Sequence, residues 1–379
     1  MLVLKLLFWL SLASLLWTHL LYPLFIAVFA RLRPRAIKID ATYLPRVALI
    51  IAAYNEDDVI TSKLDNALLL DYPQDRLRII VASDASSDRT DEIVAAYSDR
   101  GIELCRTPRG GKVNAQNVTV RTLTDVDVLA FSDANCHWQP DAMRKLVSRL
   151  ADPQVAYVCG QLRLRSPEGT NQEGAYWRFE VWLRGQESRV HSVTGGNGSI
   201  YAVRRERYEE VDPRFGHDLS FPYLMVKRGF RAVYAPDAIV TEKMTTDLED
   251  EFNRKVRMFG HCWLLVLHGR MFSLRSLGLT YWIEMVSHRL LRYTSGLLHI
   301  VLLVTSTVLA WDSGGVYTVV LVLQGLFVAA VIASMLVRGK VRLLAIPHYY
   351  LLITWATVVA LKDVVRGVPA VWERAEGSR

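Results

Sequence analysis

The sequence predicts an α/β domain with transmembrane helices at its N-terminal and C-terminal ends. Short apolar runs alternate with helical patterns across the middle of the chain, as in a mainly parallel sheet covered by helices. Long stretches almost free of charge occupy both ends of the 379 residues. A mean hydropathy of +0.17 with 22% charged residues fits this combination, because a soluble enzyme is usually less apolar and a bare membrane bundle less charged.

The composition excludes several other classes of protein. A hydrophobic content of 51% is too high for a disordered or collagen-like chain. The net charge of +7 suits a surface near anionic lipid or an anionic substrate, but no basic run with interleaved aromatics predicts a nucleic-acid partner. The cysteines show neither a CxxC pair nor zinc-ligand spacing, so reduced thiols on the cytosolic side are expected; they are Cys105, Cys136, Cys159 and Cys262.

The N-terminal apolar stretch predicts one transmembrane helix. Residues Leu2 to Phe29 contain a single charge, Lys5, and are long enough to cross about 30 Å of hydrocarbon. A basic cluster follows at once and favours the cytoplasmic side; it comprises Arg31, Arg33, Arg35 and Lys38. A cleaved signal peptide is the alternative, but the stretch is too long and the cations lie at the wrong end.

Three further apolar segments follow the soluble part, at 290–310, 316–337 and 343–361. The loop between the first two has no cation, whereas the 338–342 loop is strongly basic, so the positive-inside rule places the soluble domain in the cytoplasm. Four crossings would leave the C-terminus outside, and the charges of the tail do not decide its side. One segment lying in the interface or re-entering the membrane is the alternative to a crossing.

The segment from Phe252 to Val286 combines cations with aromatics at amphipathic spacing, which suggests helices on the membrane surface. Packing of these helices against the soluble domain is the alternative. The predicted organisation is then an N-terminal helix with its basic flank at 1–38, a cytoplasmic domain at 39–248, interfacial helices at 249–286, and C-terminal transmembrane helices with a short tail at 287–379.

The soluble domain shows three apolar runs that read as buried strands, at 47–52, 78–82 and 126–131, with helical segments at 59–68 and 91–97. Polar residues end each run, at the sheet edge where open α/β sheets bind ligands. No GxGxxG follows the first strand and no GxxxxGK[ST] occurs, so neither a dinucleotide-binding dehydrogenase nor a P-loop enzyme is supported.

Three motifs in the first half of this domain carry candidate chemistry. Asp84 ends the second strand and could accept hydrogen bonds from a base or ribose, although such Asp-Ser clusters are often turns. The 108–112 loop ends in Lys112, which could neutralise an anion, or the loop is a solvated turn. Asp133 and Asn135 are two oxygen-bearing side chains one residue apart, which could face one Mg²⁺ or Mn²⁺.

Three motifs lie in the second half. Residues 194–198 contain three glycines, which suggests a close approach of backbone to a ligand or a purely conformational loop. His217-Asp218 opens a helical stretch, where Asp218 could be a helix cap or a general base. Arg254 and Arg257 lie three residues apart and could clamp a diphosphate or contact lipid headgroups.

As an ordered set, these motifs resemble glycosyltransferase family 2, and more narrowly its membrane-embedded branch with hyaluronan, chitin-oligosaccharide, poly-N-acetylglucosamine and cellulose synthases. The resemblance covers the soluble domain to about Trp263 and extends more loosely to the membrane helices. It implies a GT-A fold, a nucleotide-diphosphate sugar donor with a UDP-sugar expected, a divalent cation (Mg²⁺ or Mn²⁺) and inversion at the anomeric carbon.

The resemblance also implies a role for each matching residue. On the donor side, Asp84 would hold the nucleoside, Ala53 and Glu56 would lie near the base, and Lys112 would approach the nucleotide. Asp133 and Asn135 match the DxD metal motif, Asp218 matches the base of the ED motif, and Arg254 and Arg257 match the Q/RxxRW motif that contacts the diphosphate. The acceptor side would comprise Gly195, Gly196, His217 and Trp263.

The sequence departs from the family pattern at three positions. Asn135 replaces the second acid of DxD, so the cation site loses one charge. His217 replaces the Glu of ED, which alters the electrostatics around Asp218. Met258 stands where the motif has a Trp that stacks on the acceptor sugar in processive enzymes, a role that Trp263 could take over.

The expected protein is an inverting hexosyltransferase of the inner (plasma) membrane, with several membrane crossings and a cytoplasmic catalytic domain. It would extend a glycan, as in β-linked polysaccharide synthesis, or transfer to a lipid-linked acceptor. The alternative is transfer of a single sugar to a polyprenyl or other lipid-linked acceptor. A third hypothesis, from another class, is an inactive nucleotide-sugar sensor or scaffold.

Overall fold

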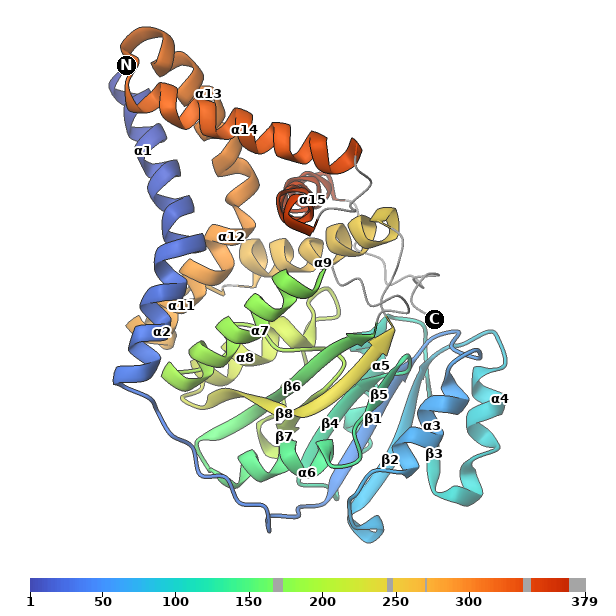
Figure 1. The fold of residues 1–379 in the computed structure, drawn as a ribbon. Coiled ribbons are helices and arrows are strands. Elements are labelled where there is room, and N and C mark those ends of the chain that lie inside the picture. The colour runs from blue at the N-terminus through green and yellow to red at the C-terminus, as the bar shows by residue number, and fades with distance from the viewer. Residues whose placement is uncertain (166–172, 244–247, 270, 337–341, 368–379) are drawn as a thin grey trace.

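A computed structural model describes residues 1–165, 173–243, 248–269, 271–336 and 342–367. In this part of the chain a central sheet is covered by helices on both faces, and a group of long helices projects from one side (Figure 1). The basic 338–341 loop and the tail after 367, which entered the topology argument, lie outside the described residues.

The described sheet has eight strands in the order β3-β2-β1-β4-β7-β6-β8-β5. Strands β1 to β4 are parallel to one another, whereas β7 is antiparallel to both β4 and β6, and β5 to β8. The expectation of a mainly parallel sheet therefore holds for one half, and the sheet as a whole is mixed. The bounds are β1 Val47–Ala53, β2 Leu77–Asp84, β3 Ile102–Thr107, β4 Val128–Asp133, β5 Cys136–Trp138, β6 Val155–Arg165, β7 Tyr201–Arg204 and β8 Arg231–Lys243.

Strand β1 is buried at every position because helices cover both faces of the sheet. Its side chains alternate between two cores: Leu49 and Ile51 pack with α3, α4 and α6, whereas Ala48 and Ile50 pack with α5 and α8. The bounds of these helices are α3 Ile60–Leu68, α4 Thr90–Ala95, α5 Lys112–Arg121, α6 Ala142–Val147 and α8 His217–Lys227.

Three described helical segments are long and apolar enough to cross a membrane: Leu2–Leu32, Ser295–Ser313 and Val316–Leu336. The first consists of α1 Leu2–Leu16, a π-helical turn Trp17–Leu21 and α2 Tyr22–Leu32. Helix α1 packs against α13 Ser295–Ser313, and α13 packs against α14 Val316–Leu336. These segments coincide with three of the four apolar stretches expected from the sequence.

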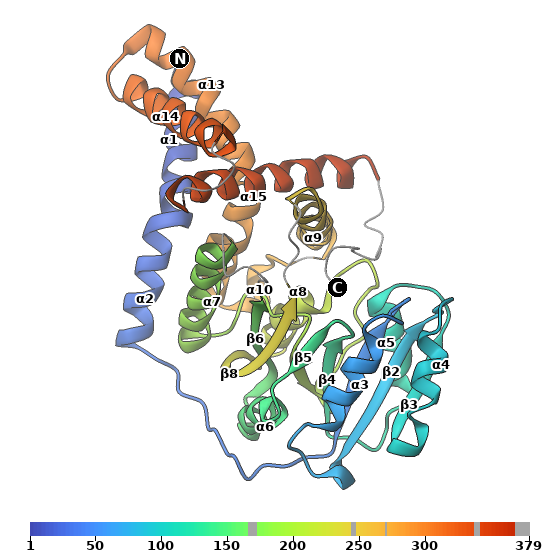
Figure 2. The same cartoon turned by 45° about the vertical axis from the view of Figure 1, so that its right-hand side comes forward.

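The fourth apolar stretch lies within α15 Arg342–Val365, which takes a different direction. Figures 1 and 2 show α15 crossing between α14 on one side and α9 Leu248–His268 on the other. The indole Nε1 of Trp263 on α9 donates a hydrogen bond to the carbonyl oxygen of Thr357 at 2.9 Å. Helix α15 therefore links the long apolar helices to the α/β domain.

The predicted interfacial region is helical, as expected, and α9 packs against α15 in the interior of the protein. It continues as α10 Leu274–Leu277, α11 Leu279–Met285, a π-helical turn Val286–Leu290 and α12 Leu291–Tyr293. Helix α7 Glu173–Val190 packs against α2. All four cysteines are free thiols in the structure.

Candidate active site

The carboxyl ends of β1, β2 and β4 meet at one edge of the sheet and bring the first three motifs together. In the parallel register Ala53 lies opposite Ser83, and Ala52 lies opposite Asp133. The loops that leave β1 and β2 contain the two described non-glycine residues with a left-handed backbone, Asn55 and Ala85. Such conformations cluster at functional sites, so the two turns single out this edge as a site.

Asp84 is fully buried and holds the glycine-containing loop 108–112 in place. Its carboxylate accepts hydrogen bonds from the backbone N–H groups of Gly110 at 2.8 Å and Gly111 at 2.9 Å, and it pairs with the guanidinium of Arg109. That guanidinium lies 3.5 Å from the ring centroid of Tyr54. The residue expected to hold a nucleoside therefore also fixes the loop that presents Lys112.

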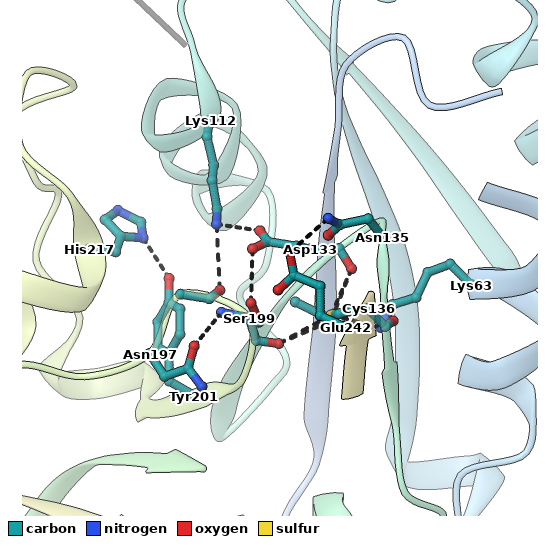
Figure 3. Close-up of polar contacts among 12 residues, drawn as sticks. Lys63, Lys112, Asp133, Asn135, Cys136, Asn197, Ser199, Tyr201, His217 and Glu242 are labelled. Atoms are coloured by element: carbon teal, nitrogen blue, oxygen red, sulfur yellow. Dashed lines mark hydrogen bonds and ion pairs between the residues drawn. The ribbon is translucent and has the colours of Figure 1, made fainter. Parts of the chain in front are cut away.

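Lys112 begins α5 and forms an ion pair with Asp133 at the end of β4, as Figure 3 shows. Burial disfavours the charged lysine, but the Asp133 carboxylate outweighs burial and raises the pKa of Lys112. The other oxygen of Asp133 accepts a hydrogen bond from the Ser199 hydroxyl at 3.3 Å. The cation expected at the nucleotide and the acid expected at the metal thus lie in direct contact.

Asn135 turns its amide nitrogen to Glu242 on β8, at 3.0 Å from Oε1 (Figure 3). Burial, together with the nearby Asp133 carboxylate, raises the pKa of Glu242 to about 7. Glu242 was not identified from the sequence, because it stands outside any motif and its strand pairs with β5 only in the folded sheet. It supplies a second carboxylate near Asp133, where the sequence lacks the second acid of DxD.

The Gly195-Gly196 segment is packed tightly against Asp218. The N–H of Gly196 donates a hydrogen bond to the carbonyl oxygen of Asp218 at 2.6 Å. A Cβ at Gly196 would lie 1.8 Å from the hydroxyl of Tyr157, and one at Gly195 would lie 2.3 Å from the Arg289 guanidinium. A Cβ at either glycine would require a neighbour to move, more easily at Gly195, where that neighbour is the end of a flexible side chain. Asp218 lies at the wall of a cavity beside this segment.

His217 lies inside an aromatic cluster that also reaches this wall. Its Nδ1 is 2.8 Å from the hydroxyl of Tyr201, and its ring contacts Phe221 with centroids 4.8 Å apart. Burial and the nearby Lys112 lower the pKa of His217 to about 3, so the imidazole is neutral. His217 is thus suited to hold the start of α8 in position beside Asp218.

The α9 residues of the expected set divide into two groups. Arg254, Arg257 and Met258 line the cavity, and Arg254 pairs with Glu251 at 2.6 Å. Trp263 is buried against α15 and is absent from the lining residues. This placement gives no support to the expectation that Trp263 replaces the acceptor-stacking Trp of the motif.

The two remaining donor-side residues border the sheet edge. Ala53 is fully buried in the core, so only its backbone at the end of β1 faces the loops. Glu56 follows in the loop, and its N–H donates to the hydroxyl of Thr90 at 2.8 Å.

One large cavity, about 1230 Å³ in volume, connects these groups with the long helices. At one end it contacts Lys112 and Asp133, and in the middle Gly195, Gly196 and Asp218. At the other end it reaches α1, α13, α14 and α15. The catalytic candidates and the apolar helices therefore border a single continuous space.

The mixed sheet, with acids and a glycine loop at the ends of its parallel strands, defines a GT-A-like α/β fold of glycosyltransferases. A family model described as "Glycosyltransferase like family 2" matches residues 45–260, and the chain belongs to this family. The family prediction is thereby confirmed.

Several curated glycosyltransferases are similar to this chain in sequence. An N-acetylglucosaminyltransferase of Rhizobium meliloti (strain 1021) is 30% identical over 58% of this chain and 56% of its own length. A β-monoglucosyldiacylglycerol synthase of Synechocystis (strain ATCC 27184 / PCC 6803 / Kazusa) is 30% identical over 41% of this chain and 33% of its own length. A probable glycosyltransferase of Bacillus subtilis (strain 168) is 28% identical over 62% of this chain and 61% of its own length. The chain thus spans between about a third and three fifths of the length of these three relatives.

Among solved structures, a mannosyltransferase of Pyrobaculum calidifontis in complex with GDP-Man and Mn²⁺ superposes with a TM-score of 0.70. The match covers 95% of this chain and 99% of that protein at 22% identity. The similarity therefore extends beyond the α/β domain to the fold of the surrounding helices.

Proposed function

We propose that this protein is an inverting hexosyltransferase that moves a sugar from a nucleotide-diphosphate sugar to an acceptor held at the membrane. The observation that carries the proposal is the single cavity that joins Lys112, Asp133 and Asp218 to the apolar helices. A water-soluble donor can meet the charged end of this space, and a membrane-bound acceptor can meet the other.

The donor end suits a nucleoside diphosphate sugar. Lys112, Arg254 and Arg257 line the cavity as cations that can neutralise a diphosphate, and Asp84 stands at the neighbouring strand end for the nucleoside. A UDP-sugar is the expected donor from the resemblance, whereas the similar mannosyltransferase was solved with GDP-Man. Donors of both kinds therefore belong in the test.

The residues beside Asp133 fit a divalent cation. Asp133, the amide oxygen of Asn135 and Glu242 provide the oxygen ligands that Mg²⁺ and Mn²⁺ prefer, and two neighbouring carboxylates are stabilised when a cation neutralises them. When bound, the cation would offset the negative charge of the leaving diphosphate. The similar mannosyltransferase was solved with Mn²⁺.

Asp218 is the proposed general base. Its carboxylate would take the proton of the acceptor hydroxyl while that oxygen forms a bond to the anomeric carbon. The bond from the anomeric carbon to the diphosphate oxygen breaks, and its electron pair leaves with the nucleoside diphosphate. Lys112, Arg254 and Arg257 stabilise this leaving group electrostatically, and attack from the opposite side inverts the anomeric centre.

The catalytic domain is assigned to the cytoplasmic face of the inner (plasma) membrane. Three crossings, with α15 in the interface, would put the domain on the side of the basic cluster after α2, which the positive-inside rule favours as the cytoplasmic side. The protein would be a multi-pass enzyme whose active site opens towards the nucleotide-sugar pool.

The alternatives differ in the number of sugars that one acceptor receives. A polymerising synthase fits the resemblance to hyaluronan and cellulose synthases, and the N-acetylglucosaminyltransferase relative accords with it. Transfer of a single sugar to a lipid-linked acceptor is the second candidate, favoured by Met258 at the position of the stacking Trp and by the placement of Trp263 away from the cavity. An inactive nucleotide-sugar sensor would bind donor without turnover.

The test is a panel of UDP- and GDP-sugars with the purified full chain in membrane nanodiscs, with Mg²⁺ or Mn²⁺ added. Release of nucleoside diphosphate and the size of the labelled product are measured. Turnover of one donor, lost in Asp133→Ala, supports the proposal, and product length separates the synthase from single transfer. Donor binding without any release would establish the sensor and overturn the proposal.

A further inference from the structure

The part of the cavity that lies among the long helices has a largely apolar lining that the catalytic groups do not use, with a few polar members such as His19, His299 and Gln324. Leu12 and Leu15 of α1, Leu302 of α13 and Phe327 of α14 form part of this lining. Two further lining residues, Leu16 and Leu323, are 46% and 58% exposed, so the apolar part of the cavity reaches the outer surface of the helices. A space of this kind suits a hydrocarbon chain rather than a hydrated glycan.

Between the apolar part and Asp218 lies a buried cluster of charged residues, hereafter the arginine cluster: Arg184, Arg289, Arg292, Glu180 and Glu187. Arg292 forms an ion pair with Glu180. The Nε of Arg289 donates to the Thr194 hydroxyl at 3.0 Å, which in turn donates to Glu187 at 3.0 Å. Through Thr194 and Gly195 the cluster adjoins the proposed acceptor side of the catalytic centre.

The arginine cluster carries more positive than negative charge. Three guanidinium groups face two carboxylates, and His288 lies between the carboxylates at 3.0 Å from Glu180 and 2.7 Å from Glu187. Burial lowers the pKa of His288, and even with a neutral imidazole one cation is in excess. Glu284 adds no compensating charge, because burial raises its pKa well above the usual value.

Arg184 is the unbalanced member of the cluster. It is 7% exposed and lines the cavity, and its Nε and Nη1 have no hydrogen-bond partner among the described residues. The aromatic rings of Trp177 and Tyr234 lie 5.9 Å and 5.8 Å from its guanidinium carbon and partly stabilise it. A buried guanidinium without an anion is costly, so a ligand that brings a negative charge here would be bound strongly.

We infer that the acceptor is an anionic lipid whose phosphate group is held by Arg184 and the arginine cluster. Its hydrocarbon chain lies in the apolar space between α1, α13 and α14, and a hydroxyl beyond the phosphate reaches Asp218. The order of groups along the cavity, from apolar wall to cations to base, matches the order chain, phosphate, hydroxyl in such a lipid. This inference rests on the proposed function and names the substrate class of the same site.

The charge of the whole cavity agrees with two anionic ligands. Among the described residues that line it there are eight cationic side chains and four acids, and the cations divide between the two ends. Lys112 and the arginines of α9 belong to the donor end, whereas Arg184, Arg289 and Arg292 belong to the acceptor end. A diphosphate donor accounts for the first group and the lipid phosphate for the second.

The experiment uses the full chain in nanodiscs, as wild type and as Arg184→Gln. Arg189→Gln is the matched control, because Arg189 is exposed on the same helix and lies outside the cavity. The lipid probes are phosphatidylglycerol, a polyprenyl-diphosphate-linked sugar, and diacylglycerol with the acyl chains of the phosphatidylglycerol as the phosphate-free probe. Lipid binding is measured by native mass spectrometry, sugar transfer by label in the organic extract, and donor turnover by nucleoside diphosphate release without added acceptor.

We expect Arg184→Gln to weaken binding of one or both phosphate-containing lipids, and transfer to them, about tenfold, the effect of a lost charge-assisted contact. Diacylglycerol binding, the donor KM and the acceptor-free release should stay unchanged, and Arg189→Gln should behave as wild type. If only phosphatidylglycerol binding weakens, the phosphate belongs to a phospholipid; if only binding of the polyprenyl-diphosphate-linked sugar weakens, it belongs to a lipid-linked sugar. Leu323→Trp, which narrows the chain path at an exposed position, should lower lipid transfer while donor turnover persists.

The inference fails if diacylglycerol or a soluble oligosaccharide is the better acceptor, or if Arg184→Gln affects all lipids equally. It also fails if the variant raises the donor KM, because Arg184 would then belong to the diphosphate site. If Arg184→Gln does not fold, Leu323→Trp still compares lipid transfer with donor turnover. Absence of any donor turnover in wild type would contradict the proposed function, whereas the binding measurement would still decide the lipid site.

Discussion

The charged side chains at the two ends of the cavity differ in whether they already have partners within the protein. At the donor end the acids and cations are matched: Asp84 pairs with Arg109, and Asp133 pairs with Lys112. At the acceptor end Arg184 retains two N–H groups without a hydrogen-bond partner in the described part of the chain. The acids Asp84 and Asp133 at the donor end thus have cationic partners without ligand, whereas Arg184 at the acceptor end has no anionic partner among the described residues.

This difference indicates how each end would respond to its ligand. A donor must exchange existing ion pairs for new ones, so its net binding energy depends on the contacts that replace the Lys112–Asp133 pair. An anionic acceptor adds a partner where none exists and releases no internal one. Substitutions at the two ends, and at the point where they meet, can break or sharpen this contrast.

The largest effect is expected at the point where the two ends meet. Asp218→Asn removes the proposed base and should lower transfer about a thousandfold, within the usual range for loss of general base catalysis. Donor binding should remain, because the donor-end pairs do not involve Asp218. Single-turnover transfer and donor affinity, measured by calorimetry, check this. Undiminished transfer would remove Asp218 from the mechanism.

In the metal-free protein, the free energy of unfolding should depend on pH through the ionisation of Glu242. Its folded pKa of about 7 lies above the ordinary value of 4.5, so its contribution to stability is complete below about pH 4.5 and is lost as pH rises through 7. The shift corresponds to about 3 kcal/mol as an upper limit. Chemical denaturation of the apoprotein between pH 5 and 8, compared with Glu242→Gln, measures it. A pH profile that is the same in both proteins would contradict the assigned pKa.

At the acceptor end, packing should be more sensitive at Gly196 than at Gly195. A Cβ at Gly196 meets the hydroxyl of the fully buried Tyr157, whereas one at Gly195 meets the terminal atoms of the Arg289 side chain. Gly196→Ala should therefore cost about 1–3 kcal/mol of folding free energy. Gly195→Ala should cost less, because a flexible guanidinium can move. Equal thermal shifts for the two variants would mean that Tyr157 relaxes as easily as Arg289.

The smallest effect is expected from restoring the missing acid of DxD. Asn135→Asp adds a carboxylate beside Asp133 and Glu242, so the concentration of Mn²⁺ needed for half-maximal nucleoside diphosphate release should fall about tenfold. Asn135→Ala, which removes the amide oxygen, provides the opposite comparison. An unchanged metal requirement in both variants would place the cation elsewhere.

The sequence predicted the donor half of the site better than the acceptor half, for a physical reason. Strand ends such as Asp84 and Asp133 can be read from the chain, because each follows its own apolar run and parallel strands bring their carboxyl ends to one edge. Glu242 and Arg184 carry no such local signal. They join the site only when β8 pairs with β6 and β5, and when α7 packs against α2.

The membrane part shows the same limit of local information. The apolar stretches at 2–29, 290–310, 316–337 and 343–361 predicted four membrane segments, and hydropathy alone did not distinguish the last, which lies in α15, from the other three. The direction of α15 is determined by its contacts with α9, including the hydrogen bond from Trp263 to Thr357. Likewise, the family resemblance offered Trp263 as a substitute for the missing motif Trp, and only the folded chain shows that its indole N–H donates to Thr357 and that Trp263 is absent from the cavity lining.

Because α15 contacts both α9 and α14, the α/β domain packs against the long helices through α15 and is not joined to them by a linker alone. The separation between Asp218 and the apolar lining of the cavity is then a fixed length of the molecule. An acceptor whose reactive hydroxyl is too close to its hydrocarbon, or too far from it, cannot satisfy both ends at once. The protein would therefore select acceptors by the length of the spacer between these groups, in the manner of a gauge, before the identity of any sugar is considered.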